Sequence, residues 1–245
     1  MTIKPHLNGR IALVTGGSRG IGAAVAMALA DAGAAVAVNY RERAAEAEAI
    51  VTSIKDKGGR AIAVAADVSR TAAVAKMIDN VSTALGPIDI LVNNAGMAIV
   101  RNIDELTEAD FDLTIAVNLK SAFLCTQAVL PAMRAKKWGR IVNISSGAAR
   151  GAGAIGVHYN ASKAGMEGLT RGYAARLVKQ GITVNAVAPS LIETDMMRGR
   201  SDLAARIPLG RLGQPDEVAQ AVLMVLGNDY MTGQTIMLNG GMTFI

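Results

Sequence analysis

Short apolar runs rich in Val, Ile and Ala recur along the chain, with longer amphipathic stretches between them. Seven runs predict β-strands at residues 10–15, 34–40, 61–68, 88–95, 139–145, 181–189 and 234–240. The intervening stretches show helical spacing of apolar residues, as in Val74, Ile78, Val81 and Leu85. The predicted strands are apolar on both sides, which is typical of parallel strands covered on both faces. The pattern therefore predicts an α/β fold, a doubly wound, seven-stranded parallel sheet with helices on both faces.

We find no internal repeat or linker that would divide the chain, so a single domain over residues 1–245 is expected. The stretch from 190 to 214, after the sixth predicted strand, has an irregular pattern. Ligands of open α/β sheets bind beyond the carboxyl ends of the strands, so this stretch is a candidate substrate lid. A simple surface excursion is the alternative.

Composition narrows the class of protein. The chain is 51% hydrophobic with 26 Gly and 3% aromatic residues, which excludes disorder and suits Ala-rich helices packed on a sheet. No apolar run looks long enough to span a bilayer, and the first residues lack the apolar core of a secretory signal, so we expect a cytoplasmic protein. The single cysteine, Cys125, is interpreted as a buried hydrophobic residue. The net charge is +5, but the basic residues are scattered, and an acidic small ligand explains them better than nucleic acid.

A glycine-rich turn, TGGSRGIG at residues 15–22, follows the first predicted strand and opens a helix. Such a junction presents backbone N–H groups to a pyrophosphate, and it predicts a Rossmann-type dinucleotide site, with a purely structural turn as the alternative. The expected cofactor contacts in the turn are Gly16, Ser18, Arg19, Gly20, Ile21 and Gly22.

The end of the second predicted strand selects the dinucleotide. It reads Asn39, Tyr40, Arg41, without the acidic residue that would bind the ribose of NAD. Arg19 and Arg41, with Arg43 as a third candidate, can instead hold a 2′-phosphate. The sequence therefore predicts NADP(H) as cofactor, with Asn39, Tyr40 and Arg41 in contact with it.

A tyrosine and a lysine, Tyr159 and Lys163, are four residues apart at the start of a predicted helix, so they share one face. Ser145 and Ser146 end the fifth predicted strand. Both elements should meet at the carboxyl edge of the sheet, beside the nicotinamide.

In combination, these motifs resemble the short-chain dehydrogenase/reductase superfamily over the whole length of the chain. The matching pieces, in order, are residues 15–22, Asp67-Val68, 93–96, Asn118, Ser146, Tyr159 with Lys163, 185–189 and Thr194. The resemblance implies a ketone/secondary-alcohol oxidoreductase. The implied cofactor contacts outside the glycine turn and the second strand are Asp67, Val68, Asn94, Ala95, Gly96, Tyr159, Lys163, Pro189, Ile192 and Thr194.

The resemblance also implies catalytic roles. Tyr159 would exchange the proton, and Lys163, together with the oxidised nicotinamide, would lower the pKa of its phenol while also holding the ribose. Ser146 would polarise the carbonyl, and Asn118 would hold a water that relays protons. Structural alternatives exist: Asp67 could only cap a helix, Asn93 and Asn94 could only form turns, and Ser146 could be a loop hydroxyl. His6 and His158 are interpreted as exposed and without a role, and no metal site is expected.

Two features bear on the substrate. Within the superfamily the chain resembles the 3-oxoacyl-acyl-carrier-protein reductases of fatty-acid biosynthesis, so a 3-oxoacyl thioester is the first expectation and an acyl carrier protein a possible partner. Lys136 and Lys137 are candidates for contacting it, with a solvated helix end as the alternative. A ketoreductase or sugar/polyol dehydrogenase acting on free small molecules is the second interpretation, and a non-catalytic NADP(H) sensor a remote third. Ser190 stands where the family usually has glycine, and a positive φ there would strain it.

The resemblance further implies a homotetramer that pairs helices and the last strands. The apolar stretch Ile236–Ile245 fits burial at such an interface.

Overall fold

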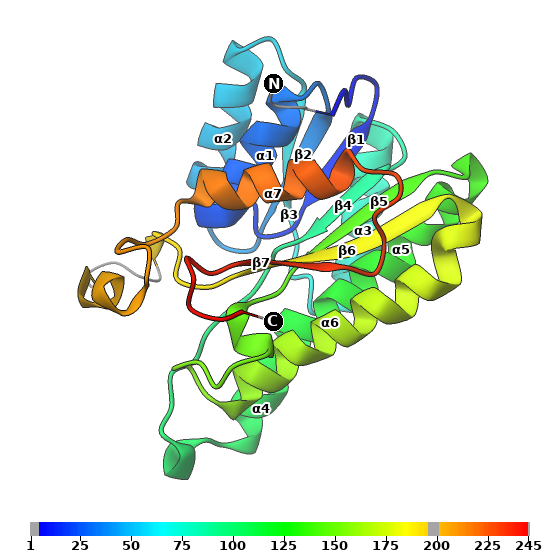
Figure 1. Ribbon diagram of the computed structural model, residues 1–245. Coiled ribbons are helices and arrows are strands. Elements are labelled where there is room, and N and C mark those ends of the chain that lie inside the picture. Colours follow the sequence, from blue (N-terminus) through cyan, green and yellow to red (C-terminus); the bar gives the residue numbers. More distant parts are fainter. Residues whose placement is uncertain (1–4, 196–200, 245) are drawn as a thin grey trace.

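The chain forms one parallel sheet flanked by helices in a computed structural model that describes residues 5–195 and 201–244 (Figure 1). The seven strands have the order β3-β2-β1-β4-β5-β6-β7, and every pair is parallel. They are β1 (Ile11–Val14), β2 (Ala35–Tyr40), β3 (Ala61–Ala65), β4 (Ile90–Asn93), β5 (Gly139–Ile144), β6 (Ile182–Pro189) and β7 (Thr235–Leu238). The predicted fold class is confirmed, and β1 lies between β2 and β4, where the strand order reverses and ligands of such folds bind.

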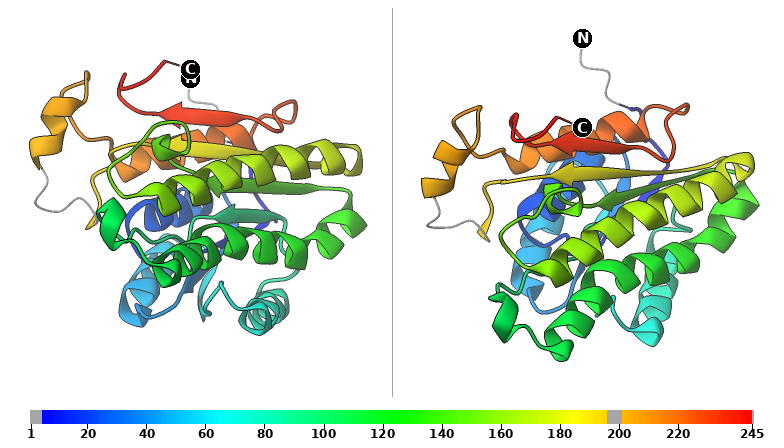
Figure 2. Two further views of the ribbon diagram at one scale, coloured as in Figure 1. Left: turned by 90° about the horizontal axis from the view of Figure 1, so that it is seen from below. Right: turned by 60° about the horizontal axis from the view of Figure 1, so that its bottom comes forward.

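Helices cover both faces of the sheet, as predicted (Figure 2). They are α1 (Gly20–Asp31), α2 (Ala44–Asp56), α3 (Thr71–Ala84), α4 (Glu108–Ile115), α5 (Ser121–Lys136), α6 (Val157–Leu177) and α7 (Pro215–Leu226). Alternate strand residues point to opposite faces: Ala12 and Val14 of β1 pack in the core under α1, α2 and α7, whereas Leu13 packs in the core under α3, α5 and α6. Both cores consist of buried apolar side chains, which explains why the strands look apolar on both sides.

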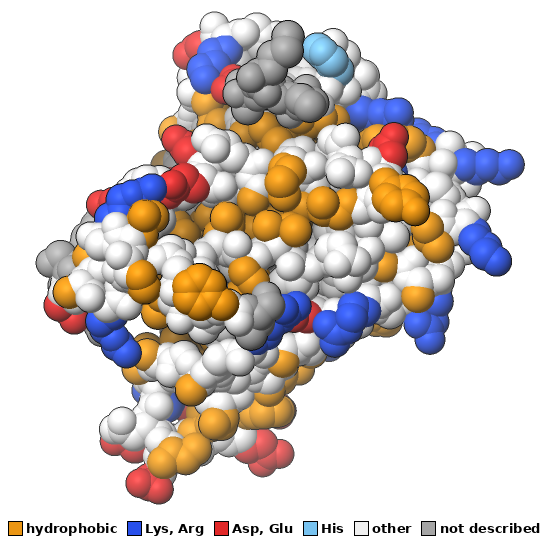
Figure 3. All heavy atoms as spheres, viewed as in Figure 1, with side chains coloured by type: hydrophobic (Ala, Val, Ile, Leu, Met, Phe, Trp, Pro, Cys, Tyr) orange, Lys and Arg blue, Asp and Glu red, His pale blue; other side chains and the backbone are white. Residues whose placement is uncertain are grey.

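One face carries exposed apolar side chains near the edge strand β7. All four residues of β7 are only partly buried, and Tyr230, Met242 and Phe244 beside it are exposed. Figure 3 shows hydrophobic side chains across the middle of this face. An uncovered edge strand with apolar neighbours is a surface on which another chain can pack.

A single π-turn, η2 (Ala116–Lys120), joins α4 and α5 into one continuous helix. By length and composition alone this helix, Glu108–Lys136, could span a membrane, contrary to the expectation that no apolar run would be long enough. In the fold, however, it contributes to the apolar core beneath α5, where Cys125 is buried as predicted. Burial raises the pKa of the Cys125 thiol to about 12.

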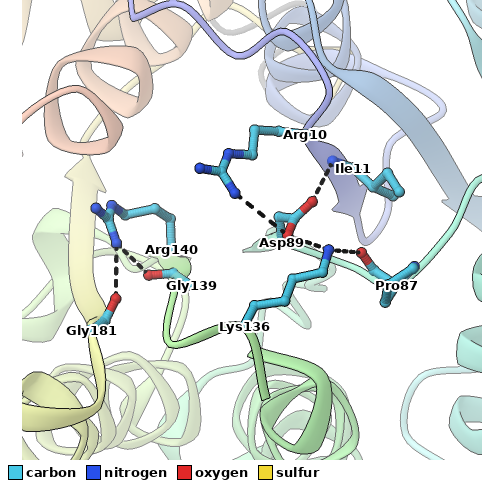
Figure 4. Close-up of polar contacts among 8 residues, drawn as sticks. All are labelled: Arg10, Ile11, Pro87, Asp89, Lys136, Gly139, Arg140 and Gly181. Atoms are coloured by element: carbon cyan, nitrogen blue, oxygen red, sulfur yellow. Dashed lines mark hydrogen bonds and ion pairs between the residues drawn. The ribbon is translucent and has the colours of Figure 1, made fainter. Parts of the chain in front are cut away.

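A polar network closes the amino edge of the sheet, opposite the carboxyl ends (Figure 4). The buried Asp89 carboxylate accepts hydrogen bonds from the Ile11 N–H (3.0 Å) and from Lys136 Nζ (2.6 Å). The buried Arg140 donates to the carbonyl oxygens of Gly139 (2.8 Å) and Gly181 (3.2 Å). Lys136 is exposed at the helix end, but its ammonium group is already bound beside the start of β4, so it is not a free docking residue.

The segment after β6 reaches back across the sheet edge. Ile192 forms a parallel bridge with Gly213, and the short 3-10 helix Ser201–Arg206 lies between them in the sequence. Leu203 and Ile207 are buried, so the described part of the candidate lid packs on the domain. The remaining residues of the candidate lid, 196–200, lie outside the described residues.

Candidate active site

A cavity of about 400 Å³ opens at the carboxyl edge of the sheet. Its walls come from the turn after β1 and from the ends of β2, β4, β5 and β6. Every residue predicted to contact the cofactor lines this cavity, and so do three of the four catalytic candidates, Ser146, Tyr159 and Lys163. The motifs that are scattered along the sequence thus meet at one site.

The glycine turn is shaped by close backbone contacts. Gly16 has a φ of +60°, a conformation that favours glycine. A Cβ on Gly22 would lie 2.6 Å from Asn94 Nδ2, so no side chain fits there. Asn94 Nδ2 donates to the carbonyl oxygens of Thr15 and Gly16, both at 3.0 Å. Asn94 therefore acts on the cavity by fixing the turn, and Thr15, which sequence reasoning missed, accepts from the Asn94 and Ala95 N–H groups through Oγ1.

The amino end of α1 is open toward the cavity. Its N-cap residue, Arg19, makes no side-chain capping bond, and Gly20, Ile21 and Gly22 line the cavity wall. The first backbone N–H groups of a helix have no partner within the helix, and its dipole favours an anion. This end of the cavity therefore fits a pyrophosphate group.

Three arginines surround the neighbouring end of the cavity. Each arginine forms an ion pair with a carboxylate. The nitrogen–oxygen distances are 3.3 Å for Arg19–Asp195, 2.6 Å for Arg41–Glu42 and 3.0 Å for Arg43–Glu46. These pairs are about half exposed, and such pairs are worth only about 0–1 kcal/mol. Their guanidinium groups can therefore exchange a surface carboxylate for a phosphate at little cost. The arrangement fits the 2′-phosphate of NADP(H).

Asn39 supports the site from inside the protein. Its Oδ1 accepts from the Gly16 N–H at 3.2 Å, and its Nδ2 donates to the carbonyl oxygens of Val64 and Ala66, both at 3.2 Å. The side chain is buried, and its hydrogen bonds link the glycine turn to β3.

The sequence left two roles open for Asp67, a cofactor contact and a cap at the start of a helix, and its contacts fit both. It lines the cavity, and its Oδ1 also accepts from the N–H (3.0 Å) and the hydroxyl (2.6 Å) of Ser69 ahead of α3. Partial burial raises the pKa of Asp67, but the hydrogen bonds from Ser69 outweigh it, so that the pKa lies below its ordinary value. The carboxylate is therefore ionised at neutral pH and available as an acceptor.

Ser146 and Tyr159 both line the cavity wall, with the Ser146 hydroxyl close to the phenol. Ser146 Oγ also accepts from the Ala148 N–H at 3.2 Å. Burial raises the pKa of Tyr159, and the hydrogen bond with Ser146 opposes it only in part. Tyr159 is consequently a protonated donor at neutral pH, which differs from the lowered pKa expected from the sequence.

The position of Lys163 explains this difference. Its Nζ donates to the Ile144 carbonyl oxygen at 2.8 Å and lies 5.8 Å from the centroid of the Tyr159 ring. The ammonium group therefore interacts mainly with β5 in this state. Burial lowers the pKa of Lys163 to about 8, because a charged amine is poorly solvated there.

Asn118 lies behind the cavity wall, in the π-turn η2. Its Oδ1 accepts from the Met97 N–H (2.8 Å), while its Nδ2 donates to the Met97 carbonyl oxygen (3.0 Å) and to Ser162 Oγ (3.2 Å). Protein partners thus occupy the whole side-chain amide, which joins the segment after β4 to α6. π-turns are frequent at functional sites. The predicted water relay through Asn118 stays a prediction.

His158 contradicts the expectation that it is exposed. It is fully buried, and its Nε2 lies 3.0 Å from the Ile99 carbonyl oxygen. The Arg101 N–H donates to the Ile155 carbonyl oxygen at 3.4 Å nearby. These contacts join the segment after β4 to the start of α6, next to Tyr159. No sequence motif indicated this contact, because its partner is a backbone atom of a distant loop.

Comparison with known proteins identifies the family. Residues 10–204 match the family model of the short chain dehydrogenases. The chain belongs to the short chain dehydrogenase family. The resemblance drawn from the motifs is thereby confirmed, and the protein is an oxidoreductase.

Curated relatives from this family cover nearly the whole chain. A subunit of (2S)-((R)-hydroxy(phenyl)methyl)succinyl-CoA dehydrogenase from Thauera aromatica is 43% identical over 242 residues, which covers 96% of this chain and 97% of the relative. The 3-oxoacyl-(acyl-carrier-protein) reductase of Staphylococcus aureus is also 43% identical, with coverage of 94% and 97%. Among solved structures, a short chain dehydrogenase from Burkholderia cenocepacia in complex with NADP has a TM-score of 0.90 and 40% identity, covering 97% of this chain and 99% of the other.

Proposed function

We propose that this short chain dehydrogenase reduces the ketone of a 3-oxoacyl thioester to a secondary alcohol with NADPH. The observation that carries the proposal is that Ser146 and a protonated Tyr159 lie together on the wall of the cavity. A ketone oxygen placed against this pair meets two hydroxyl donors at one point. This is the arrangement that carbonyl reduction requires.

The cofactor is NADP(H), as the sequence predicted, and it supplies the hydride when bound. The open amino end of α1 would hold the pyrophosphate, and Arg19 and Arg41 would hold the 2′-phosphate. A solved relative in this family is in complex with NADP. Asp67 and Thr194, both on the cavity wall, would contact the adenine and nicotinamide ends respectively.

The protein side chains handle the proton. Tyr159 donates its phenolic proton to the ketone oxygen as that oxygen gains negative charge. Ser146 Oγ accepts a hydrogen bond from the Ala148 N–H, and its own O–H would turn from the phenol to donate to the same oxygen. Lys163 Nζ lies 5.8 Å from the centroid of the Tyr159 ring, and its shift from the Ile144 carbonyl oxygen toward the phenol would stabilise the phenolate left behind. Solvent returns the proton to Tyr159.

Relatives support a thioester substrate. One is named as a reductase of a 3-oxoacyl group on a carrier protein, and another as a subunit of a dehydrogenase of a hydroxylated acyl-CoA. The shared chemistry is an acyl thioester with an oxygen function on the chain. Lys136 gives no support to a carrier-protein surface, because Asp89 and the Pro87 carbonyl oxygen bind its ammonium group at the amino edge, opposite the cavity.

The test is NADPH oxidation, followed by absorbance, with four kinds of substrate: acetoacetyl-CoA, acetoacetyl carrier protein, small free ketones and sugar-derived ketones. We expect the thioesters to be preferred. Activity on free ketones or sugars alone would make the enzyme a small-molecule ketoreductase. Tight NADPH binding without turnover of any substrate would indicate a cofactor sensor. A strong preference for the carrier-bound form over the CoA form would place the enzyme in fatty-acid or polyketide elongation.

We also propose a homotetramer in the cytoplasm. The edge strand β7 and the exposed Tyr230, Met242 and Phe244 beside it form an apolar surface suited to one of its interfaces (Figure 3). Burying such a surface against a second copy stabilises the assembly.

A further inference from the structure

Ser190 is a wall residue of the cavity that the mechanism above does not use. It follows β6 directly and lines the same cavity as Ser146 and Tyr159. Its N–H donates to the Leu238 carbonyl oxygen at 2.9 Å, which fixes its backbone. Within residues 5–195 and 201–244, Lys137 is the one non-glycine residue with a positive φ. The strain considered for Ser190 from the sequence is therefore absent.

The hydroxyl of Ser190 lies beside Gly147, the residue that follows Ser146 after the end of β5. A Cβ added to Gly147 would lie 2.7 Å from Ser190 Oγ, so the hydroxyl occupies the space that the missing side chain of Gly147 leaves. Within the described residues, Ser190 Oγ makes no hydrogen bond. A partly buried hydroxyl on a cavity wall without a protein partner is available to a ligand.

The adjacent ends of β5 and β6 bring this hydroxyl to the same cavity wall as Ser146. The pairing of β5 with β6 ends at Ile144 and Val187, and Gly147 contacts Ser190 just beyond these strand ends. Adjacent parallel strands are about 4.8 Å apart. A substrate oxygen held by Ser146 and Tyr159 therefore has Ser190 at the neighbouring strand end. A 3-oxoacyl thioester carries its second carbonyl only one carbon away from the ketone, which suits two hydroxyl groups on adjacent strands.

We propose that Ser190 Oγ donates a hydrogen bond to the thioester carbonyl oxygen of the substrate and thereby selects 3-oxoacyl thioesters over simple ketones. The inference rests on the proposed function. Glycine at this position would offer no donor to that carbonyl. A net hydrogen bond of this neutral kind changes affinity by about fivefold.

The test compares wild type with Ser190→Ala and Ser190→Gly on two substrates. One is the N-acetylcysteamine thioester of acetoacetate, and the other is 2-pentanone, which lacks the second carbonyl. We expect kcat/KM for the thioester to fall about fivefold in both variants, while kcat/KM for 2-pentanone and KM for NADPH stay unchanged. Binding of the 3-hydroxybutyryl thioester to the enzyme saturated with NADP⁺, measured by calorimetry, should weaken by the same factor.

Several results would overturn the inference. An equal loss on both substrates would mean that Ser190 contacts the reacting ketone, and a raised KM for NADPH would mean that it contacts the cofactor. Unchanged kinetics in both variants would mean that the hydroxyl does not contact the substrate. These outcomes leave the proposed function intact if wild type still prefers thioesters. If wild type reduces 2-pentanone but not the thioester, the proposed function and the inference both fail.

Discussion

Replacing Lys163 with methionine should make the folded protein more stable at neutral pH while abolishing activity. Lys163 is buried, and burial lowers its pKa from 10.5 to about 8. At about 1.36 kcal/mol for each pKa unit, keeping this amine charged in the fold at pH 7 costs about 3 kcal/mol. Methionine has a similar length and no charge, but it loses the hydrogen bond to the Ile144 carbonyl oxygen, worth about 1 kcal/mol. The expected gain is about 2 kcal/mol.

The sign of the pH dependence follows from the lowered pKa. Between pH 8 and 10.5 the unfolded chain binds the lysine proton and the folded chain does not, so the stability of wild type rises with pH in this window. Methionine does not titrate. The advantage of Lys163→Met should therefore be full at pH 7, shrink above pH 8 and disappear near pH 10.

The assay is urea unfolding without cofactor, followed by the fluorescence of the single tryptophan, Trp138, at pH 7, 8.5 and 10 and at one protein concentration. Trp138 stacks against Arg10 and Arg140, with their guanidinium carbons 3.7 and 4.4 Å from the ring centroid, so unfolding changes its surroundings. Lys76→Met is the matched control, because Lys76 is exposed on α3. An advantage independent of pH, or a variant less stable than wild type at pH 7, would refute the reasoning.

Three further predictions concern the site and the assembly. Tyr159→Phe should lower kcat by about 100-fold or more, because the proton donor is lost. NADPH binding, measured by nucleotide fluorescence, should persist. Turnover comparable to wild type would show that Tyr159 is not the proton donor. Arg19→Ala combined with Arg41→Ala should lower the ratio of kcat/KM for NADPH to kcat/KM for NADH by about tenfold or more. The reason is that each guanidinium group contributes about 1 kcal/mol or more to binding a phosphate. An unchanged ratio would mean that other residues bind the 2′-phosphate. Sedimentation at assay concentration should give a tetramer, and a stable monomer would contradict the interface at β7.

The sheet and the cofactor end of the site follow from local sequence patterns. Strands buried on both faces must be apolar on both sides, and this pattern located all seven strands. The glycine turn could be interpreted because its geometry depends on residues next to one another, such as Gly16 and Gly22. Strand ends were less well predicted: β3 stops at Ala65, and Asp67 and Val68 already lie in the loop beyond it.

The features that the sequence did not reveal depend on partners far along the chain. Lys136 is bound because Asp89 lies beside it, and His158 is buried because the loop at Ile99 covers it. The sequence predicts a lowered pKa for Tyr159, but burial raises it, while Lys163 donates to the Ile144 carbonyl oxygen. Such properties depend on tertiary packing, and no spacing rule contains them.

The two edges of the sheet use polar residues in opposite ways, and this difference explains where the chemistry lies. At the amino edge the buried Asp89 receives a backbone N–H and an ammonium group, so its charge is balanced within the fold. At the carboxyl edge the first turn of α1 lacks a side-chain cap, and Lys163 is held buried although its charge is disfavoured there. Buried polar groups are tolerated when their hydrogen bonds are complete, and incomplete ones cost stability until a ligand supplies the missing partner. The carboxyl edge is therefore built to be completed by a dinucleotide and a carbonyl compound.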